Sequence, residues 1–214
     1  MALDDGLNAA LSPLHFGFNA PLWASVIKLQ VSRVKPIEDM AVRYFGAWKA
    51  AQEGRATADQ LALNEELVAT LLVNPEADHA FQVLFHPTAS KDAALLLVAM
   101  RGLLSSAEQM VKQAEPLGKG AALQQAVGVF TKSQPFVKLF RDVLIHNDEY
   151  SVGLGRQRNK ATIPDKGMGV VQNDDGRIVV TWGGHEMYLL QAADDSLILW
   201  RALCDEYWGK LLAK

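Results

Sequence analysis

The chain has 214 residues, of which 50% are hydrophobic and 21% charged, and its formal net charge is -3. This composition is that of an ordinary globular protein and excludes a mainly disordered chain. The single cysteine, Cys204, excludes an internal disulfide, and its apolar helical pattern indicates a buried structural thiol. The acidic start, and a longest apolar run of only eight residues (93–100), predict a cytoplasmic protein that does not span a membrane.

The first segment, residues 1–35, combines glycine, proline and scattered aromatic residues without a sustained period. We expect it to form an irregular N-terminal arm packed on the body of the protein. Apolar and polar residues alternate over residues 26–34, which is typical of a half-buried strand. Pro36 equally permits a short helix that ends at this point.

The second segment, residues 36–166, has the spacing of a helical bundle. Pro36 is expected to begin a helix, since a missing N–H costs nothing in the first turn. Thr57 is expected to cap the next helix, which stops before the Asn-Pro pair at 74–75. The two helices are predicted to form a helical hairpin.

A third strong helix is predicted from Lys91 to about Glu115, with Ser90 as its cap. Its apolar face is nearly continuous, so we expect it to be the most buried element. His79 and His86 are expected in the connection around Pro87, as solvated or capping side chains instead of a metal pair. A short helix is predicted over residues 121–132.

The third segment, residues 167–214, changes character. Residues 170–172 and 178–182 flank a turn of acidic residues and glycine, which indicates a β-hairpin, and residues 186–190 extend it after Gly183-Gly184. A last helix is expected to begin at residues 194–196, with an apolar stripe that serves as core or subunit contact. The fold class predicted is mainly α, an antiparallel helical bundle with a small C-terminal β-hairpin or meander and a final helix packed on it.

The stretch from Ser133 to Arg158 concentrates charged and titratable residues at the margin of one predicted helix. Ser133 provides an N-cap hydroxyl, and glycines at 153 and 155 favour an end to the helix. Asp142, His146 and Tyr150 are each four residues apart, so successive side chains lie about 40° apart on one face. Arg141 and His146 diverge by about 140°, so they can converge only in a site built from more than this helix.

Arg141-Asp142-x-x-x-His146, followed by N-D-E-Y-x-x-G-x-G-R, resembles the R-x(4 to 6)-H signature of the HEPN superfamily, the higher eukaryote and prokaryote nucleotide-binding domains. The resemblance implies a helical bundle that forms a homodimer, with the arginine and histidine of both subunits in one cleft. Many members are metal-independent endoribonucleases, and others only bind. Some are toxins beside a nucleotidyltransferase-like antitoxin, so a cognate antitoxin protein is a further implied partner.

RNA cleavage by 2'-OH attack requires a base, an acid and a cation, which histidine and arginine supply at neutral pH. His146 is the expected acid or base, Arg141 the electrostatic clamp and Asp142 the orienter of the histidine. Residues 132–166 hold seven basic and four acidic residues, a net +3, which leaves -6 for the remainder. The residues expected to contact phosphate or base are Tyr150, Arg156, Arg158 and Lys160.

Three alternatives remain open at this stage. The same cleft in a non-catalytic helical dimer would bind nucleotide, RNA or a protein partner, and would need no titrating histidine. An ordinary surface helix would use His146 to cap its C-terminal turn. A metal enzyme would use His146, Asp148 and Glu149, but Asp148 points about 160° away from His146 on a helix. We therefore expect neither a metal nor another cofactor.

Overall fold

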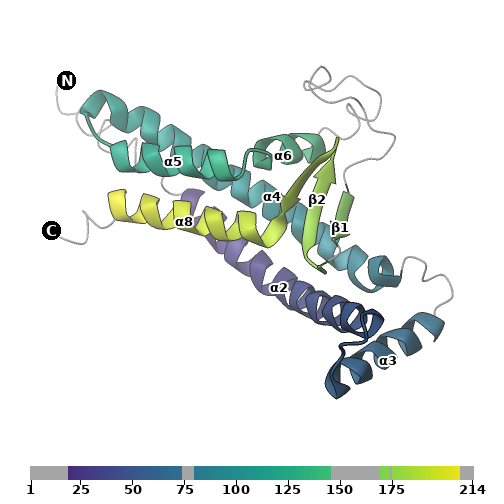
Figure 1. Cartoon of the computed structure of the whole chain (residues 1–214). Helices are drawn as coiled ribbons and strands as arrows, with labels where there is room; N and C mark the ends of the chain where they lie inside the picture. Colours follow the sequence, from purple (N-terminus) through teal and green to yellow (C-terminus); the bar gives the residue numbers. More distant parts are fainter. Residues whose placement is uncertain (1–18, 74–79, 146–168, 174, 208–214) are drawn as a thin grey trace, which may run out of the picture. The chain divides into compact units, whose positions relative to one another are not determined.

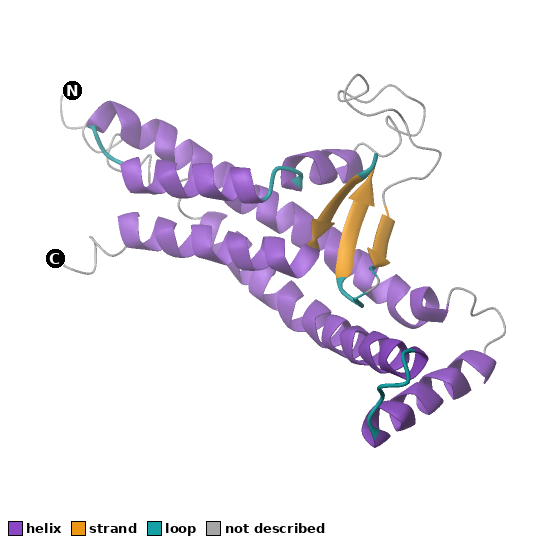
Figure 2. Ribbon diagram, in the orientation of Figure 1, coloured by secondary structure: helices purple, strands orange, loops and turns teal. Residues whose placement is uncertain are grey.

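The computed structural model describes residues 19–73, 80–145, 169–173 and 175–207 (Figure 1). These residues are mainly helical, with one small sheet near the C-terminal end of the chain, as Figure 2 shows. The predicted fold class, a mainly helical protein with a small antiparallel sheet and a final helix, is confirmed. The helices are α2 (Asn19–Gln52), α3 (Ala58–Val73), α4 (Ala80–Ala114), the short 3-10 helix η2 (Glu115–Leu117), α5 (Ala121–Ser133), α6 (Val137–Ile145) and α8 (Leu189–Tyr207).

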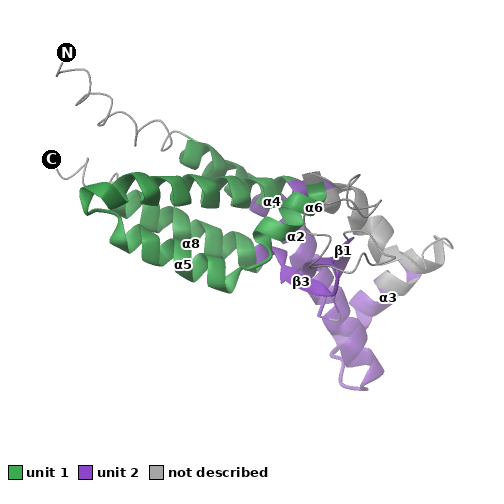
Figure 3. Cartoon of the chain, turned by 90° about the horizontal axis from the view of Figure 1, so that it is seen from above, with its two compact units in different colours: residues 1–30, 95–145, 191–214 green, residues 31–94, 146–190 purple. Residues whose placement is uncertain are grey.

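The chain divides into two compact units, shown in Figure 3. Unit 1 comprises residues 1–30, 95–145 and 191–214, and unit 2 comprises residues 31–94 and 146–190. Helices α2, α4 and α8 each contribute residues to both units. Each unit therefore combines residues from all three of the consecutive segments expected from the sequence.

Unit 1 is a helical layer with a close-packed apolar core. Helix α4 supplies much of it, including Leu96, Met100 and Leu103, each with none of its surface exposed. Gly102 allows the ring of Trp23 in α2 to lie directly on the α4 backbone, because a Cβ atom at this position would stand 2.5 Å from Trp23 Cε2. Small residues at helix contacts thus let the helices approach closely.

Unit 2 contains the sheet, in which β1 (Gly169–Gln172), β2 (Ile178–Trp182) and β3 (His185–Tyr188) form an antiparallel meander in the order β1-β2-β3. The predicted hairpin is confirmed, and a strand follows Gly183-Gly184 as expected, but it ends at Tyr188, so residues 189–190 belong to α8 and not to the strand. In the β1–β2 turn the Asn173 side-chain oxygen accepts hydrogen bonds from the backbone N–H groups of Asp175 and Arg177. An asparagine that binds its own turn fixes the hairpin locally.

The β2 strand is attached to α2 by a polar contact and a close backbone approach. The Ile178 N–H donates to the Glu38 carboxylate at 2.7 Å. Burial raises the pKa of Glu38 above its ordinary value, although this hydrogen bond and the Arg177 charge oppose the rise. Gly176 has φ of 81°, and a Cβ there would stand 2.7 Å from the backbone carbon of Ala41. Only glycine fits this turn against α2.

Helix α3 begins with the cap that the sequence predicts. Thr57 Oγ1 accepts from the Gln60 N–H at 3.3 Å, and the Thr57 N–H donates to Gln60 Oε1 at 2.9 Å. This reciprocal pair is a capping box, and it satisfies two backbone donors at the start of α3. Tyr44 of α2 hydrogen-bonds Glu66 of α3, and burial is the main cause of the raised pKa of Tyr44. The predicted hairpin of α2 and α3 is therefore held by a cap at the start of α3 and by a hydrogen bond between the two helices.

The strand expected over residues 26–34 is wrong, because this stretch lies inside α2. The buried positions Ala24, Ile27 and Val34 follow a helical repeat, while Leu29, one of the alternating apolar residues, is 50% exposed. Pro36 stands inside α2 and does not begin a helix. Buried residues on both sides of Pro36 favour a continuous helix, although proline cannot donate a backbone hydrogen bond.

Three predicted helix starts are also wrong. Helix α4 begins at Ala80, so Pro87 and His86 lie within a helix instead of a connection, and Ser90 is no cap. Ser133 ends α5, where its Oγ donates to the Phe130 carbonyl at 3.1 Å, and α6 starts only at Val137. Helix α8 starts at Leu189, ahead of residues 194–196. Helices α4 and α8 thus begin before the predicted caps, and Ser133 belongs to the helix that precedes α6, so a capping residue in the sequence did not mark the start in any of the three.

One segment of the described residues, Lys91–Leu117, is long and apolar enough to cross a membrane by length and composition, with a mean hydropathy of 1.3 over its most apolar window. Half of that window, 50%, is buried inside the structure. The core helix of a globular protein has the same properties, and the buried side chains of α4 are those of a core helix. Residues 91–115 therefore supply many of the buried side chains among the described residues.

Candidate functional site

Helix α6 carries the arginine of the sequence motif and is anchored by one apolar face. Val137, Phe140 and Val143 are buried at intervals of three residues. The ring of Phe136, just before the helix, lies 5.9 Å from that of Phe140, centroid to centroid, at an interplanar angle of 43°. This aromatic contact and the buried face fix the rotation of α6 about its axis. Arg141 therefore lies at the margin of the buried face, partly covered.

Arg141 and Asp142 form an ion pair on α6, in which Arg141 Nη1 donates to Asp142 Oδ1 at 3.0 Å. The two side chains are 35% and 25% exposed, respectively. Partial burial strengthens such a pair relative to one in open water. The contact occupies one of the five N–H donors of a guanidinium and leaves its fork able to bind a phosphate. Asp142 was expected to orient His146, but the described contact of Asp142 is with the neighbouring arginine.

The connection from α5 to α6 is tied to α8. Gln134, which is only 9% exposed, donates through Nε2 to Asp195 Oδ2 at 2.7 Å. Gln191 of α8 donates to the other oxygen of Asp195 at 3.3 Å. Because α6 begins three residues after Gln134, this bridge fixes the position of its start. Asp195 is thus a positioning residue, whereas the sequence predicts it at a helix start.

Two further cations lie close to Arg141 in the sequence. Lys132 at the end of α5 and Lys138 in the first turn of α6 are both exposed. Together with Arg141 they give three basic residues within ten positions of unit 1. This local positive charge is the described part of the basic stretch that the sequence predicts.

The rest of the predicted site lies outside the described residues, so its geometry stays a prediction. Among the residues that the structure does describe, no group of three or more His, Cys, Asp or Glu side chains could hold a metal ion. Burial raises the pKa of the Cys204 thiol, which disfavours the nucleophilic thiolate form. The predicted site residues outside the described ranges are His146, Tyr150, Arg156, Arg158 and Lys160, together with Asp148 and Glu149 of the metal alternative.

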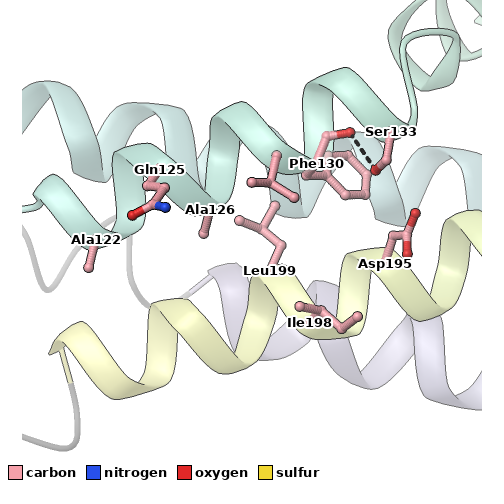
Figure 4. Close-up of a pocket in the computed structure, with 9 residues that line it drawn as sticks. Ala122, Gln125, Ala126, Phe130, Ser133, Asp195, Ile198 and Leu199 are labelled. Carbon is pink, nitrogen blue, oxygen red and sulfur yellow. Dashed lines mark hydrogen bonds between the residues drawn. The ribbon is translucent and has the colours of Figure 1, made fainter.

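Unit 1 also contains a groove of about 360 Å³ between α5 and α8 (Figure 4). The two helices run antiparallel beside each other (Figure 1). Ser133 and Asp195 lie at one end of the groove, and Ala122 lies at the other (Figure 4). Most of the lining is small or apolar, from Ala122, Ala126, Val129, Phe130, Ile198 and Leu199.

Comparisons of this chain with models of protein families, with curated proteins and with solved structures gave no match. The residues of this chain, and the sequence motif that they form, are therefore the basis for a proposed function.

Proposed function

We propose that the protein is a metal-independent endoribonuclease that acts as a homodimer in the cytoplasm. The observation that carries the proposal is the placement of Arg141, which stands half-buried on an anchored helix and is held by Asp142. A fixed guanidinium is suited to the charge that grows on a phosphate during cleavage. His146 follows directly after the last residue of α6.

The proposed reaction is cleavage by the neighbouring hydroxyl of the RNA. A base removes the proton of the 2'-OH, the 2' oxygen attacks phosphorus, and a 2',3'-cyclic phosphate forms. The bond from phosphorus to the 5' oxygen breaks, and an acid protonates that oxygen. His146 serves as the base or acid, and Arg141 stabilises the phosphate charge. No metal or other cofactor enters any step.

The proposed RNA contacts continue beyond α6. Arg156, Arg158 and Lys160 follow two glycines in the sequence, a pattern that presents side chains and backbone donors to phosphates. Tyr150 is a further contact to phosphate or base. Exposed Lys132 and Lys138 add charge on the described side of the motif. A cognate antitoxin that covers these residues is part of the same proposal.

One described contact favours a second candidate, a non-catalytic dimer that binds nucleotide, RNA or a protein through the same residues. Asp142 pairs with Arg141, so its carboxylate already has a function that needs no histidine. A binding protein needs the fixed cation but not the titrating group. Both candidates therefore require Arg141 for function, whereas only the ribonuclease requires His146.

The proposed ribonuclease activity is tested by incubating purified protein with single-stranded RNA in the presence of EDTA. The products are resolved on a gel. We expect cleavage to persist in EDTA and to fall about 100-fold or more in His146→Ala and in Arg141→Ala. The matched control is Arg55→Ala, which removes another arginine paired with a nearby carboxylate, that of Glu53, in a turn of unit 2. Equal cleavage by wild type and His146→Ala would identify a contaminating nuclease.

Binding is measured separately, by fluorescence anisotropy of labelled RNA over a range of salt concentrations. Alanine at Arg156, Arg158 and Lys160 together should weaken binding and flatten its salt dependence, because each phosphate that the protein no longer neutralises lowers the slope by about 0.7. RNA binding that persists in a protein with no cleavage supports the non-catalytic candidate. Disappearance of cleavage in EDTA, restored by added metal, would instead support the metal enzyme.

A further inference from the structure

The groove between α5 and α8 is apolar along most of its length and carries a charge at one end (Figure 4). Among the described residues that line it, Asp195 is the only one with an ionisable side chain. Binding sites for small molecules are mostly apolar with a few polar groups, and their volumes start at about 300 Å³. With a volume of about 360 Å³, the groove has the size and the composition of a site for a small ligand.

The carboxylate of Asp195 is held in place by uncharged groups. Gln134 Nε2 donates to one of its oxygens at 2.7 Å, and Gln191 Nε2 donates to the other at 3.3 Å. A carboxylate has about four acceptor positions, so these two bonds leave room for a further donor. None of the ion pairs among the described residues includes Asp195. In this part of the chain its negative charge is therefore not balanced by a cation.

Ser133 adds a second hydrogen-bond acceptor at the same end of the groove (Figure 4). Its Oγ donates to the Phe130 carbonyl at 3.1 Å. The hydroxyl hydrogen is thus already used, and the lone pairs of the oxygen are able to accept. The polar end of the groove therefore offers acceptors, which suit a group that has several N–H donors and a positive charge.

The other charged side chains close to the groove in sequence lie outside its lining. Lys132 of α5 is exposed, and it neither lines the groove nor forms an ion pair with Asp195. On α8, Arg201 and Asp205 are exposed and lie beyond residues 195–199, which hold the α8 part of the lining. These three charges act on a ligand only across solvent, where they are screened. The charge inside the groove is that of Asp195.

We propose that this groove binds a small organic amine, whose protonated nitrogen pairs with Asp195 and whose alkyl part lies along the apolar wall. A protonated primary amine has three N–H donors and no acceptor, which matches the acceptors of Asp195 and Ser133. The alkyl part would cover Val129 and Ile198, which are 62% and 58% exposed. A carboxylate ligand would be repelled by Asp195, and an uncharged one would leave its charge unpaired. The proposal does not rest on the proposed ribonuclease activity.

The proposal is tested by isothermal titration calorimetry on the full chain near pH 7, with three probes of equal chain length. The probes are n-octylamine, which is protonated at this pH, 1-octanol and octanoate. We expect n-octylamine to bind about tenfold or more tightly than 1-octanol, because it adds a charge-assisted hydrogen bond, and octanoate to bind most weakly. Absence of octylamine binding at millimolar concentration, or equal affinity for all three probes, would overturn the proposal.

Asp195→Asn tests the carboxylate. The amide removes the charge and keeps an oxygen that accepts from Gln134, so octylamine binding should weaken about tenfold while octanol binding stays the same. Asp194→Asn is the matched control, since Asp194 is the neighbouring exposed carboxylate of α8 and does not line the groove. Circular dichroism confirms that each variant is folded. Equal weakening by the two substitutions would show an effect of net charge and would contradict the proposed pairing.

Ala126→Leu tests the position of the ligand without touching Asp195. A larger side chain at this lining position should weaken the binding of both n-octylamine and 1-octanol about tenfold or more, because it fills the apolar part of the groove. Gln124→Leu is the matched control, since Gln124 is exposed on α5 and does not line the groove. Octylamine binding that is unchanged in Ala126→Leu would place the amine elsewhere and overturn the proposal.

A final variant distinguishes a separate ligand from the chain itself. Residues 208–214 belong to unit 1 and contain two lysines, Lys210 and Lys214, whose side chains are also amines on alkyl chains. For a separate ligand, replacing both lysines by alanine should leave the affinity for n-octylamine unchanged. An affinity that rises about tenfold would show that these lysines compete for the groove, and it would assign the groove to the chain's own C-terminal segment instead.

Discussion

The closest glycine contact in each unit involves a different kind of atom, a side-chain ring in unit 1 and helix backbone in unit 2. In unit 1 the helices pack through small residues and ring faces, as where Trp23 lies on Gly102. In unit 2 the sheet is joined to α2 by directional contacts between single atoms, such as the hydrogen bond from Ile178 to Glu38. Side chains can shift to relieve a local clash, but backbone atoms in a tight turn cannot. Comparable substitutions should therefore have unequal effects in the two units.

The largest effect is expected for Gly176→Ala in unit 2. The new Cβ would stand within 2.8 Å of three backbone atoms of Ala41 and Val42, and the φ of 81° is itself unfavourable for alanine. Strain and overpacking together should lower the free energy of unfolding by about 3 kcal/mol. Urea denaturation measures the change.

Gly184→Ala is the matched control for Gly176→Ala. Gly184 has a similar φ of 78°, but a Cβ there would have no neighbour within 4 Å. It should cost only about 1 kcal/mol, which is the contribution of the backbone conformation alone. Equal destabilisation in the two variants would show that the contact with α2 adds nothing to the stability of unit 2.

A smaller effect is expected for Gly102→Ala in unit 1. The Cβ would stand 2.5 Å from the Trp23 ring, which is a side chain and can move. We expect the free energy of unfolding to fall by about 2 kcal/mol and the fluorescence of Trp23 to change, as judged against a variant in which Trp23 alone is replaced. If Gly102→Ala is more harmful than Gly176→Ala, the contrast between the two units is wrong.

The control for this helical position is Gly46→Ala in α2, where a Cβ would meet nothing within 4 Å. Replacing glycine by alanine in an open helix position should stabilise the protein by about 0.5 to 1 kcal/mol. The sign of the effect, and not just its size, should therefore separate the two helical glycines.

The sequence could predict the parts of the fold that depend on contacts between nearby residues, and it could not predict those that depend on packing between distant ones. The capping box of Thr57 and Gln60 and the turn at Asn173 are written in adjacent residues, so local chemistry sufficed. The N-terminal half of helix α2, before Pro36, was missed because apolar residues at 27, 29 and 31 alternate, although Leu29 is exposed. A short window of sequence cannot show which of two apolar faces the core will cover.

The candidate site divides in a similar way. The sequence placed Arg141 and Asp142 on a helix, which the structure confirms, and their pairing is an i, i+1 contact that helical spacing argues against. The bridge from Gln134 to Asp195 spans 61 residues and depends on how α5 and α8 pack. No local pattern predicts such a contact. The roles of His146 and of the basic loop remain predictions.

The smallest change in the free energy of unfolding is expected when Glu38 is replaced by glutamine. The dependence of this change on pH distinguishes a buried carboxyl from a surface ion pair. Burial raises the pKa of Glu38 above 4.5, so the folded protein binds a proton more tightly than the unfolded chain does. The stabilisation by the protonated form is complete below pH 4.5 and is lost as the pH rises through the folded pKa. A surface ion pair would produce the opposite trend.

Glu38→Gln provides the reference, because the amide oxygen can still accept from the Ile178 N–H and does not titrate. Relative to this variant, wild type should lose stability as the pH increases from below 4.5 towards neutrality, as measured by urea unfolding at each pH. Glu186→Gln is the control, since Glu186 is exposed on β3, where removal of its charge should not produce this trend. If wild type instead gains stability with rising pH relative to Glu38→Gln, then the Ile178 hydrogen bond and the Arg177 charge outweigh burial. In that case the attachment of the sheet to α2 is mainly electrostatic.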